Sequence, residues 1–537
     1  MAAAVLPFAD TRHFGHVHDD HVLRGASSLV TDGRANLEDL WGADFFGTYD
    51  EPRGQSGYWR PLVTLGSRLE VILAGGSTQG YLWLGHVITV LCHLAATLAL
   101  WRLLLALGCT WQVAVLASAL FGLHPIHVEN VSWTSGRVDS LSAAWGWAGT
   151  ALWLRGRGRG FQAAAGFACL LLAPLCKETA ALLLVLAPVA GRKMGMSWGR
   201  SLLIPALALV TTVVLRAFSF GLVHELPAEA FTGPESLTSR WATWLSIQPD
   251  LLRFAIWPGP TSPIHPVNAA ANFSAPGVSA GLALLLALSA LGFWIVWRRS
   301  AAAAYVMLLA LGTTYLLAPW VRFPTGFSEV AGPLYERYLY VAAAAPALLL
   351  GWVIARQIGA ASWRVPLVIV LAILCIGPVT ASRTLAWSSD IHFAQAGLRT
   401  APASANLWAH LGTAYLENYR MSGEPQESAA ALEAYDRALA LDSLHTRAAV
   451  NRFITLVLSE RGPEAMGQAT VLLSRWPADP FVLHNVAAWH EAEGRLETAA
   501  ELLDRELQTD RPHPETAERL EALLQRLEAQ EGRGAGR

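Results

Sequence analysis

Residues 82–102, LWLGHVITVLCHLAATLALWR, form an apolar stretch with one charged residue, at its end. A run of about 20 such residues can cross a bilayer, and it must do so as a helix because no water satisfies its backbone groups there. Nine further apolar runs follow, at residues 111–124, 138–154, 161–176, 179–191, 201–218, 277–297, 301–320, 339–355 and 365–384. Several are short for a full crossing, so we expect tilted or broken helices, especially around 161–191.

The composition agrees with a polytopic membrane protein. Of the 537 residues, 53% are hydrophobic and 15% charged, and the mean hydropathy is +0.36. These values are far from those of a soluble domain. The net charge of −2 provides no bulk attraction to nucleic acid, so we expect no such partner. All five cysteines lie in or beside apolar runs, which indicates small buried residues rather than a disulfide framework.

Basic residues set the expected orientation. They gather at every second connection, namely Arg155-Gly-Arg-Gly-Arg159, Arg192-Lys193 with Arg200, Arg298-Arg299, and Arg356 with Arg364. By the positive-inside rule these connections are cytoplasmic. The remaining connections (9–80, 124–138, Lys177-Glu178, 219–276 and 321–338) and everything after about 385 are then extracytoplasmic. Because Lys177 and Lys193 are the only lysines, the arginine-rich style favours a bacterial cytoplasmic membrane.

The N-terminal segment contains no apolar run of spanning length. Residues 1–8 are too short for a signal peptide or a span and lack a basic leader. We expect either that the chain starts outside the membrane or that a first helix is missing from the gene model. Residues 9–80 mix aromatic side chains with arginines and acids, which suits a loop on the membrane surface.

After residue 385 the sequence changes character. Trp408-x2-Leu411-Gly412-x2-Tyr415 followed by Ala431-x3-Tyr435-x2-Ala438 fits the tetratricopeptide pattern, with about seven extra residues between the two helices. Residues 444–480 and 481–511 give weaker copies, and 514–530 is expected to be a polar capping helix. Stacked helix pairs present a groove for a peptide or partner protein.

The expected fold class is therefore all-α, a polytopic membrane bundle followed by a short tetratricopeptide-repeat solenoid. We predict a first extracytoplasmic loop at 1–81, a bundle of about ten membrane segments at 82–386, a linker at 387–403, the repeat domain with its cap at 404–530, and a disordered tail at 531–537.

The extracytoplasmic connections carry charged and aromatic groups, although ionisable groups at membrane depth are costly and tend to pair or mark a substrate path. These groups are the acidic pair Asp19-Asp20, Tyr58-Trp-Arg60-Pro61, His124-Pro-Ile-His127-Val-Glu129, Gly136-Arg137-Val-Asp139, Lys177-Glu178 and Glu336-Arg337-Tyr338-Leu-Tyr340.

The ordered set of these pieces resembles the transmembrane and tetratricopeptide-repeat O-mannosyltransferases and their bacterial relatives, within the GT-C glycosyltransferase superfamily. The His86-x6-His93 helix, Trp387-x2-Asp390 and Asn406 before the repeats complete the likeness. Three features depart from the family: its first helix is absent, Thr89 stands where an Asn is common, and the repeat array is short.

The resemblance implies that a sugar passes from a polyprenyl-phosphate donor to a hydroxyl, mannose to protein Ser or Thr being the family's reaction. Asp19 or Asp20 would be the catalytic base, with inversion at the sugar. Arg137, Lys177 and Arg337 are the candidate phosphate contacts. Further substrate-binding candidates are Arg60, His124, His127, Glu129, Asp139, Glu178, Glu336, Tyr338 and Tyr340. Whether a divalent cation (Mg²⁺ or Mn²⁺) takes part, held by the histidines and aspartates, stays open, as do the sugar and the choice of a protein or glycan acceptor.

Each piece also has a structural interpretation. Asp19-Asp20 could be solvated loop acids, and His13, His16, His18 and His21 a solvated, frayed terminus rather than a metal tract. Arg137 with Asp139, and Lys177 with Glu178, could be local ion pairs at helix ends. The histidines at 86, 124 and 127 could cap helices or form hydrogen bonds within the bundle. Trp59-Arg60-Pro61 could be a turn, and residues 335–340 an interfacial belt.

Two other functions compete with the glycosyltransferase. A non-enzymatic scaffold would use the helices to anchor an extracytoplasmic repeat module for envelope proteins, and it needs no special chemistry in the charged pieces. A transporter of lipid-linked precursors ranks lowest, because such proteins often show two related halves and this chain shows no duplication.

Overall fold

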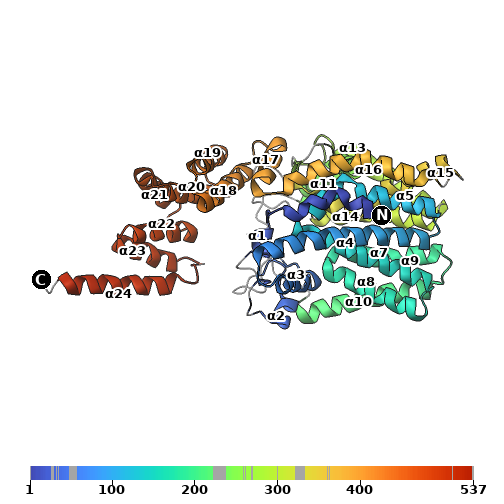
Figure 1. The fold of residues 1–537 in the computed structure, drawn as a ribbon, viewed down its shortest axis with the longest axis horizontal. Helices are drawn as coiled ribbons and strands as arrows, with labels where there is room; N and C mark the ends of the chain where they lie inside the picture. Colours follow the sequence, from blue (N-terminus) through green and yellow to red (C-terminus); the bar gives the residue numbers. More distant parts are fainter. Residues whose placement is uncertain are drawn as a thin grey trace. The chain divides into compact units, whose positions relative to one another are not determined.

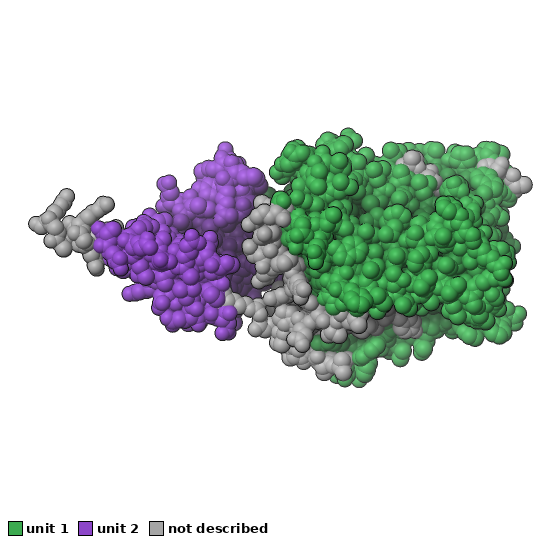
Figure 2. Space-filling model, turned by 90° about the horizontal axis from the view of Figure 1, so that it is seen from below, with its two compact units in different colours: residues 1–400 green, residues 401–537 purple. Residues whose placement is uncertain are grey.

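The computed structural model describes residues 2–534 except 26–28, 32, 34, 48–56, 222–236, 258, 260–261, 268–269, 299, 321–332, 360, 362 and 511. Parts of the predicted connections 9–80, 219–276 and 321–338 therefore lie outside the described residues. The chain divides into two compact units, Met1–Thr400 and Ala401–Arg537, which are coloured separately in Figure 2.

Unit 1 is a helical bundle, and a helix lies at each of the ten apolar runs (Figure 1). These helices are α4 (Thr78–Ala106), α5 (Trp111–Leu123), α7 (Val138–Arg155), α8 (Gly160–Cys176), α9 (Ala181–Lys193), α10 (Trp198–Ser219), α13 (Val278–Arg298), α14 (Ala301–Trp320), α15 (Ala344–Ile358) and α16 (Arg364–Thr384). The all-α fold class is confirmed. The described strands are β1 (His265–Pro266) and β2 (Pro333–Leu334), which form one short antiparallel pair.

Shorter elements join these helices or pack beside them. They are η1 (Ala2–His13), α1 (Asp20–Leu23), α2 (Leu37–Gly42), α3 (Pro61–Leu73), η2 (Pro125–His127), α6 (Val128–Ser132), η3 (Thr134–Arg137), η4 (Glu178–Ala180), α11 (Leu237–Ser246), α12 (Gln248–Ile256), η6 (Glu336–Leu339), η7 (Leu385–Trp387) and α17 (Asp390–Thr400). The last of these helices occupies most of the predicted linker. The N-terminus is not frayed, because Phe8 and Val17 are buried. Of its histidines, His13 and His21 are exposed, as the structural interpretation expected, whereas His16 and His18 are half-buried.

Four described helices are long and apolar enough to cross a membrane: α4, α10, α13 and α16 continued by η7. A fifth crossing results if α5 and the segment Pro125–Ser132, which meet at a 49° bend, count as one span. The described parts of α8, α14 and α15 are apolar but shorter. About ten crossings, as the apolar runs suggested, therefore stays a prediction.

The outer helices expose their apolar side chains. In α10, α13 and α16, only 22%, 22% and 17% of the most apolar window is buried within the protein. Phe218 and Trp297, for example, are 89% and 72% exposed. Apolar surface of this extent is stable next to lipid hydrocarbon and costly in water, so these faces indicate contact with a bilayer.

The inner helices pack closely through glycines. A Cβ on Gly149 of α7 would lie 2.8 Å from the backbone nitrogen of Leu170 in α8, and one on Gly166 of α8 would lie 2.8 Å from that of Trp153 in α7. Gly351 of α15 approaches Ala117 of α5 in the same way, at 2.7 Å. Helices inside a membrane associate through such small residues, because their backbones can then approach each other.

Unit 2 consists of three helical hairpins and a final helix. The hairpins are α18 (Ala405–Ser422) with α19 (Pro425–Leu441), α20 (Thr446–Leu458) with α21 (Gly462–Arg475), and α22 (Pro480–Ala492) with α23 (Leu496–Leu507), followed by α24 (Thr516–Gly534). The repeat motif explains the first hairpin: a Cβ on Gly412 would lie 2.7 Å from the ring of Tyr435. Of the expected tail, residues 535–537 lie outside the described residues.

Candidate active site

Charged residues lie at both ends of helix α7. It starts beside Arg137 and Asp139 and ends at Arg155, and its 18 residues correspond to about 27 Å of helix. Helix α8 likewise runs from the Arg155–Arg159 cluster to Lys177. The paired acids and bases described below therefore lie at one end of these helices, and the arginine cluster lies at the other.

The acidic pair lies in a buried turn. His18 has a φ of +57°, which turns the chain into α1. Asp20 is 1% exposed, and its Oδ1 accepts hydrogen bonds from the Ser135 backbone N–H at 3.0 Å and from the Ser135 hydroxyl. Its Oδ2 is buried without a hydrogen-bond partner among the described residues. The Asp19 side chain is 32% exposed and lies 2.9 Å from His18 Nδ1.

Asp390 of α17 also holds this turn in place. Its Oδ1 accepts a hydrogen bond from the His18 backbone N–H at 3.0 Å, and its Oδ2 lies 2.5 Å from His21 Nε2. The two contacts bracket Asp19 and Asp20. Trp387, three residues before Asp390, stacks on Trp133, with ring centroids 5.8 Å apart.

Glu70 of α3 joins two arginines. Its carboxylate accepts hydrogen bonds from Arg24 at 2.8 Å and from Arg137 at 3.0 Å, with a second bond to Arg137. All three side chains are at most 5% exposed. Although burial alone would raise it, the pKa of Glu70 is lowered by Arg137 and Arg24. Two positive charges thus share one carboxylate.

A second group connects α3, α7 and η4. Lys177 Nζ lies 2.6 Å from Asp139 Oδ1, and Asp139 Oδ2 accepts from Asn130 at 3.0 Å. Arg60 holds Glu178 with two hydrogen bonds, at 2.9 and 3.2 Å. Burial lowers the pKa of Lys177 in spite of Asp139. Burial opposes ionisation of Glu178, but Arg60 dominates and the pKa of that carboxyl falls to about 2.

Arg337 of η6 is the most accessible of the candidate phosphate contacts. It binds Glu129 through its guanidinium at 2.5 Å and through its backbone N–H at 2.9 Å, and it lies 3.8 Å from the centroid of the Tyr335 ring. Its side chain is 18% exposed, against 5% for Arg137 and 9% for Lys177. Although burial opposes it, Glu129, Tyr338 and Tyr335, with a smaller contribution from Asp19, raise the pKa of Arg337. The Tyr338 ring centroid lies 5.3 Å from the same guanidinium.

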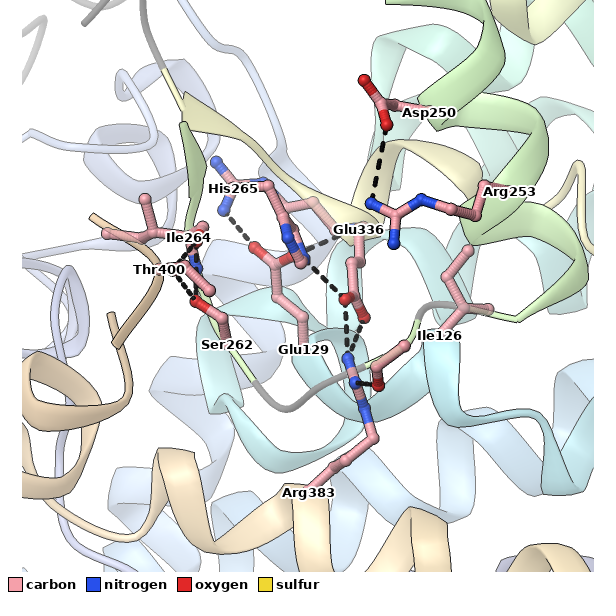
Figure 3. Close-up of polar contacts among 12 residues, drawn as sticks. Ile126, Glu129, Asp250, Arg253, Ser262, Ile264, His265, Glu336, Arg383 and Thr400 are labelled. Atoms are coloured by element: carbon pink, nitrogen blue, oxygen red, sulfur yellow. Dashed lines mark hydrogen bonds and ion pairs between the residues drawn. The ribbon is translucent and has the colours of Figure 1, made fainter. Parts of the chain in front are cut away.

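Glu336 forms the third buried group (Figure 3). Arg383 of α16 donates to both carboxylate oxygens at 2.6 and 2.7 Å, and His265 Nε2 lies 2.8 Å from one of them. Arg383 also donates to the Gly259 carbonyl at 2.7 Å. A small cavity borders this group, and Glu129, Glu336, Arg383 and Trp387 are among the residues that line it.

Three candidates lie within the bundle instead. His124 caps η2 by accepting from the Ile126 N–H, and its Nε2 lies 3.0 Å from the Ile256 carbonyl oxygen. Tyr340 contacts His93 Nδ1 at 2.7 Å. His127 is fully buried, and its ring centroid is 4.5 Å from that of Tyr340. The helix-capping interpretation therefore applies to His124.

The structure corrects the local ion pairs suggested by the sequence. Arg137 pairs with Glu70 rather than Asp139, and Lys177 pairs with Asp139 rather than Glu178. Arg24, Glu70, His265 and Arg383 were not predicted from the sequence. Only Arg383 had a signal, as a basic residue at the end of an apolar run that the sequence predicts to be extracytoplasmic. The others show no pattern that distinguishes them from ordinary surface residues.

A metal centre built from the aspartates and histidines does not appear within the described part of the chain. The one group found there with three ligand atoms close enough for an ion is His484, Glu506 and His513, in unit 2. Asp19, Asp20, His124 and His127 belong to no such group among the described residues.

The comparisons with known proteins support the resemblance. No family model matches the chain. Curated relatives include Protein O-mannosyl-transferase Tmtc1 of Drosophila melanogaster, 34% identical over 141 residues (26% of this chain and 16% of that protein). Protein O-mannosyl-transferase Tmtc2 of the same fly is 33% identical over 136 residues (25% and 14%), and tmtc2 of Xenopus laevis is 39% identical over 96 residues (18% and 11%).

The similarity to these O-mannosyltransferases is thus confirmed over about a quarter of the chain. The matches span about one seventh of the length of the two fly proteins, 16% and 14%. Their names describe the whole proteins, of which this chain matches a part.

Proposed function

We propose that the protein is a membrane glycosyltransferase of GT-C type. It moves a sugar, mannose by analogy with its relatives, from a polyprenyl-phosphate donor to a Ser or Thr hydroxyl of a protein. The reaction takes place on the extracytoplasmic side of a bacterial inner membrane, where the repeat domain also lies. The observation that carries the proposal is the buried turn of Asp19 and Asp20, tied by Ser135 to the segment that bears Arg137.

The two acids have different roles in this proposal. A general base must reach the acceptor hydroxyl within hydrogen-bond distance. Asp19 is 32% exposed and can do so, whereas Asp20 is buried and holds Ser135. Asp19 therefore takes the proton as the hydroxyl oxygen attacks the sugar carbon, and the bond to the donor phosphate breaks on the opposite face, with inversion.

Arg337 receives the departing phosphate. Its side chain is the most exposed of the three candidate phosphate contacts, and a guanidinium can hold two phosphate oxygens at once. Arg137 and Lys177 add positive charge from buried positions, where electrostatic stabilisation is strongest. Glu129 and Asp139 hold Arg337 and Lys177 in place before the donor arrives. Glu178 and Glu336 hold Arg60 and Arg383 in the same way. Arg60, Tyr338 and the polar rim formed by these pairs would contact sugar hydroxyls.

The alternative is a membrane-anchored repeat scaffold without activity, in which unit 2 binds partner proteins and unit 1 is only the anchor. The two functions differ in a direct assay. The full-length protein in detergent or liposomes is given polyprenyl-phosphate mannose and a Ser/Thr-rich peptide, and mannosylated peptide is measured by mass spectrometry. Enzyme-dependent product is expected. A folded protein that neither binds this donor nor transfers its sugar to peptide or glycan acceptors would leave only the scaffold.

A further inference from the structure

A buried carboxylate in unit 2 has an unusual set of neighbours. Glu506, at the end of α23, is fully buried. Its Oε1 accepts hydrogen bonds from the His513 backbone N–H at 3.0 Å and from the Thr516 hydroxyl at 2.8 Å, and lies 2.7 Å from His513 Nδ1. Its Oε2 lies 3.3 Å from His484 Nδ1. A buried carboxylate is costly unless cations or several donors compensate for it.

Three separate segments bring these ligand atoms together. His484 comes from α22, Glu506 from α23, and His513 from the connection to α24. One atom of each lies within 4.8 Å of the other two, and the two imidazole rings are tilted by 31° with centroids 4.1 Å apart. Two imidazoles and one carboxylate are a common protein ligand set for zinc, with metal–ligand bonds of about 2.0–2.2 Å.

We propose that His484, Glu506 and His513 bind a divalent transition metal ion, with Zn²⁺ the best match. Tetrahedral bonds of that length place ligand atoms about 3.3–3.6 Å apart. His484 Nδ1 and Glu506 Oε2 already have this separation, at 3.3 Å. His513 Nδ1 lies 2.7 Å from the other oxygen, Oε1, so it must shift toward Oε2 for both imidazoles to bind one ion beside the same carboxylate oxygen. The His484 and His513 side chains are 15% and 35% exposed, which leaves the fourth position open to water.

The surroundings of His484 also suit a ligand. A metal-binding histidine usually donates its other ring N–H to a carboxylate, which fixes the ring. Glu515 Oε1 lies 3.8 Å from His484 Nε2 and is the group available for this role. Arg519 Nη1 lies 3.4 Å from the same nitrogen, but Glu491 holds this guanidinium at 2.8 and 2.9 Å. A metal ion on Nδ1 requires the ring proton on Nε2, where it would face the Arg519 N–H. Arg519 therefore disfavours the tautomer that binds metal.

The test is a titration of the full-length protein in detergent with Co²⁺, which gives visible ligand-field bands in a tetrahedral site, followed by displacement with Zn²⁺. One tight site per chain is expected. His484→Gln, Glu506→Gln and His513→Gln should each weaken binding by more than about 100-fold, because loss of an outer-sphere partner alone costs 10- to 100-fold. Arg519→Gln should tighten it.

The control is His445→Asn, which removes an imidazole in unit 2 outside the group. His445 caps α20 by accepting from the Ala448 N–H, and Asn preserves such a cap. Circular dichroism identifies variants that fail to fold, and His513→Gln, at the half-exposed ligand, is the variant least disruptive to the core. No tight site in the wild type, or a site that folded His513→Gln and His484→Gln retain, would overturn the proposal.

Discussion

Asp20 accepts hydrogen bonds from both the backbone N–H and the hydroxyl of Ser135, a residue 115 positions further along the chain. Ser135 lies two residues before Arg137, which Glu70 holds at the start of α7. The N-terminal acids and the first candidate cation therefore belong to one rigid layer. Asp19 and Asp20 both lie in this layer, although no other part of the N-terminal sequence indicates a role for them.

Replacing Glu70 with Gln should destabilise the protein. The substitution leaves Arg24 and Arg137 buried next to each other without their shared counter-charge. Breaking a buried pair in this way costs about 3–5 kcal/mol. Thermal unfolding in detergent measures the loss. Glu70→Asp, which retains the charge, should recover part of it, whereas equal stability of Glu70→Gln and the wild type would contradict the pairing.

Asp390 should act by positioning the acidic turn. Asp390→Ala removes both contacts, to the His18 N–H and to His21, and should reduce kcat by about 100-fold, the effect of a displacement of about 1 Å in a catalytic group. Asp390→Asn can still accept from His18 and should retain much of the activity. KM for the donor should change little in both. A change in KM for the donor with an unchanged kcat would instead indicate that Asp390 acts in donor binding.

The ten apolar runs, the repeat motif and the charged pieces could be read from sequence because each has a local pattern. The partners of the charged pieces could not. Glu70 meets Arg24 and Arg137 across 46 and 67 positions, and a lone glutamate in an amphipathic helix is typical of a solvated face. The sequence favoured pairing between neighbours such as Lys177 and Glu178, but only the packing of α7 against α8 reveals that Lys177 meets Asp139.

The Lys177–Asp139 pair should be essential for stability as well as binding. Lys177→Met leaves Asp139 buried with Asn130 as its remaining partner, so we expect a loss of about 3–5 kcal/mol in unfolding free energy. The double variant Lys177→Met/Asp139→Leu should unfold at a temperature closer to wild type than the single variant, since no charge is left unpaired. A double variant as unstable as the sum of both singles would argue against this pairing.

His16 should make stability depend on pH. Burial lowers the pKa of His16 from 6.5 to about 4, so the unfolded chain binds more protons than the folded one between these values. This contribution to stability is full above pH 6.5 and is lost as the pH falls toward 4. The unfolding temperature of His16→Gln should therefore fall less than that of wild type between pH 7.5 and 4.5. An identical decrease of the unfolding temperature in both proteins would exclude His16 as a source of the pH dependence.

The most direct measurement of the central claim is the initial rate of mannosyl transfer by Asp19→Asn, at saturating polyprenyl-phosphate mannose. Asp10→Asn is the matched control, because Asp10 is an exposed acid in η1 of the same N-terminal segment. We expect Asp19→Asn to lose at least about 100-fold in rate, the usual contribution of a general base, while donor binding and folding persist. Transfer by Asp19→Asn at the rate of Asp10→Asn would contradict the account.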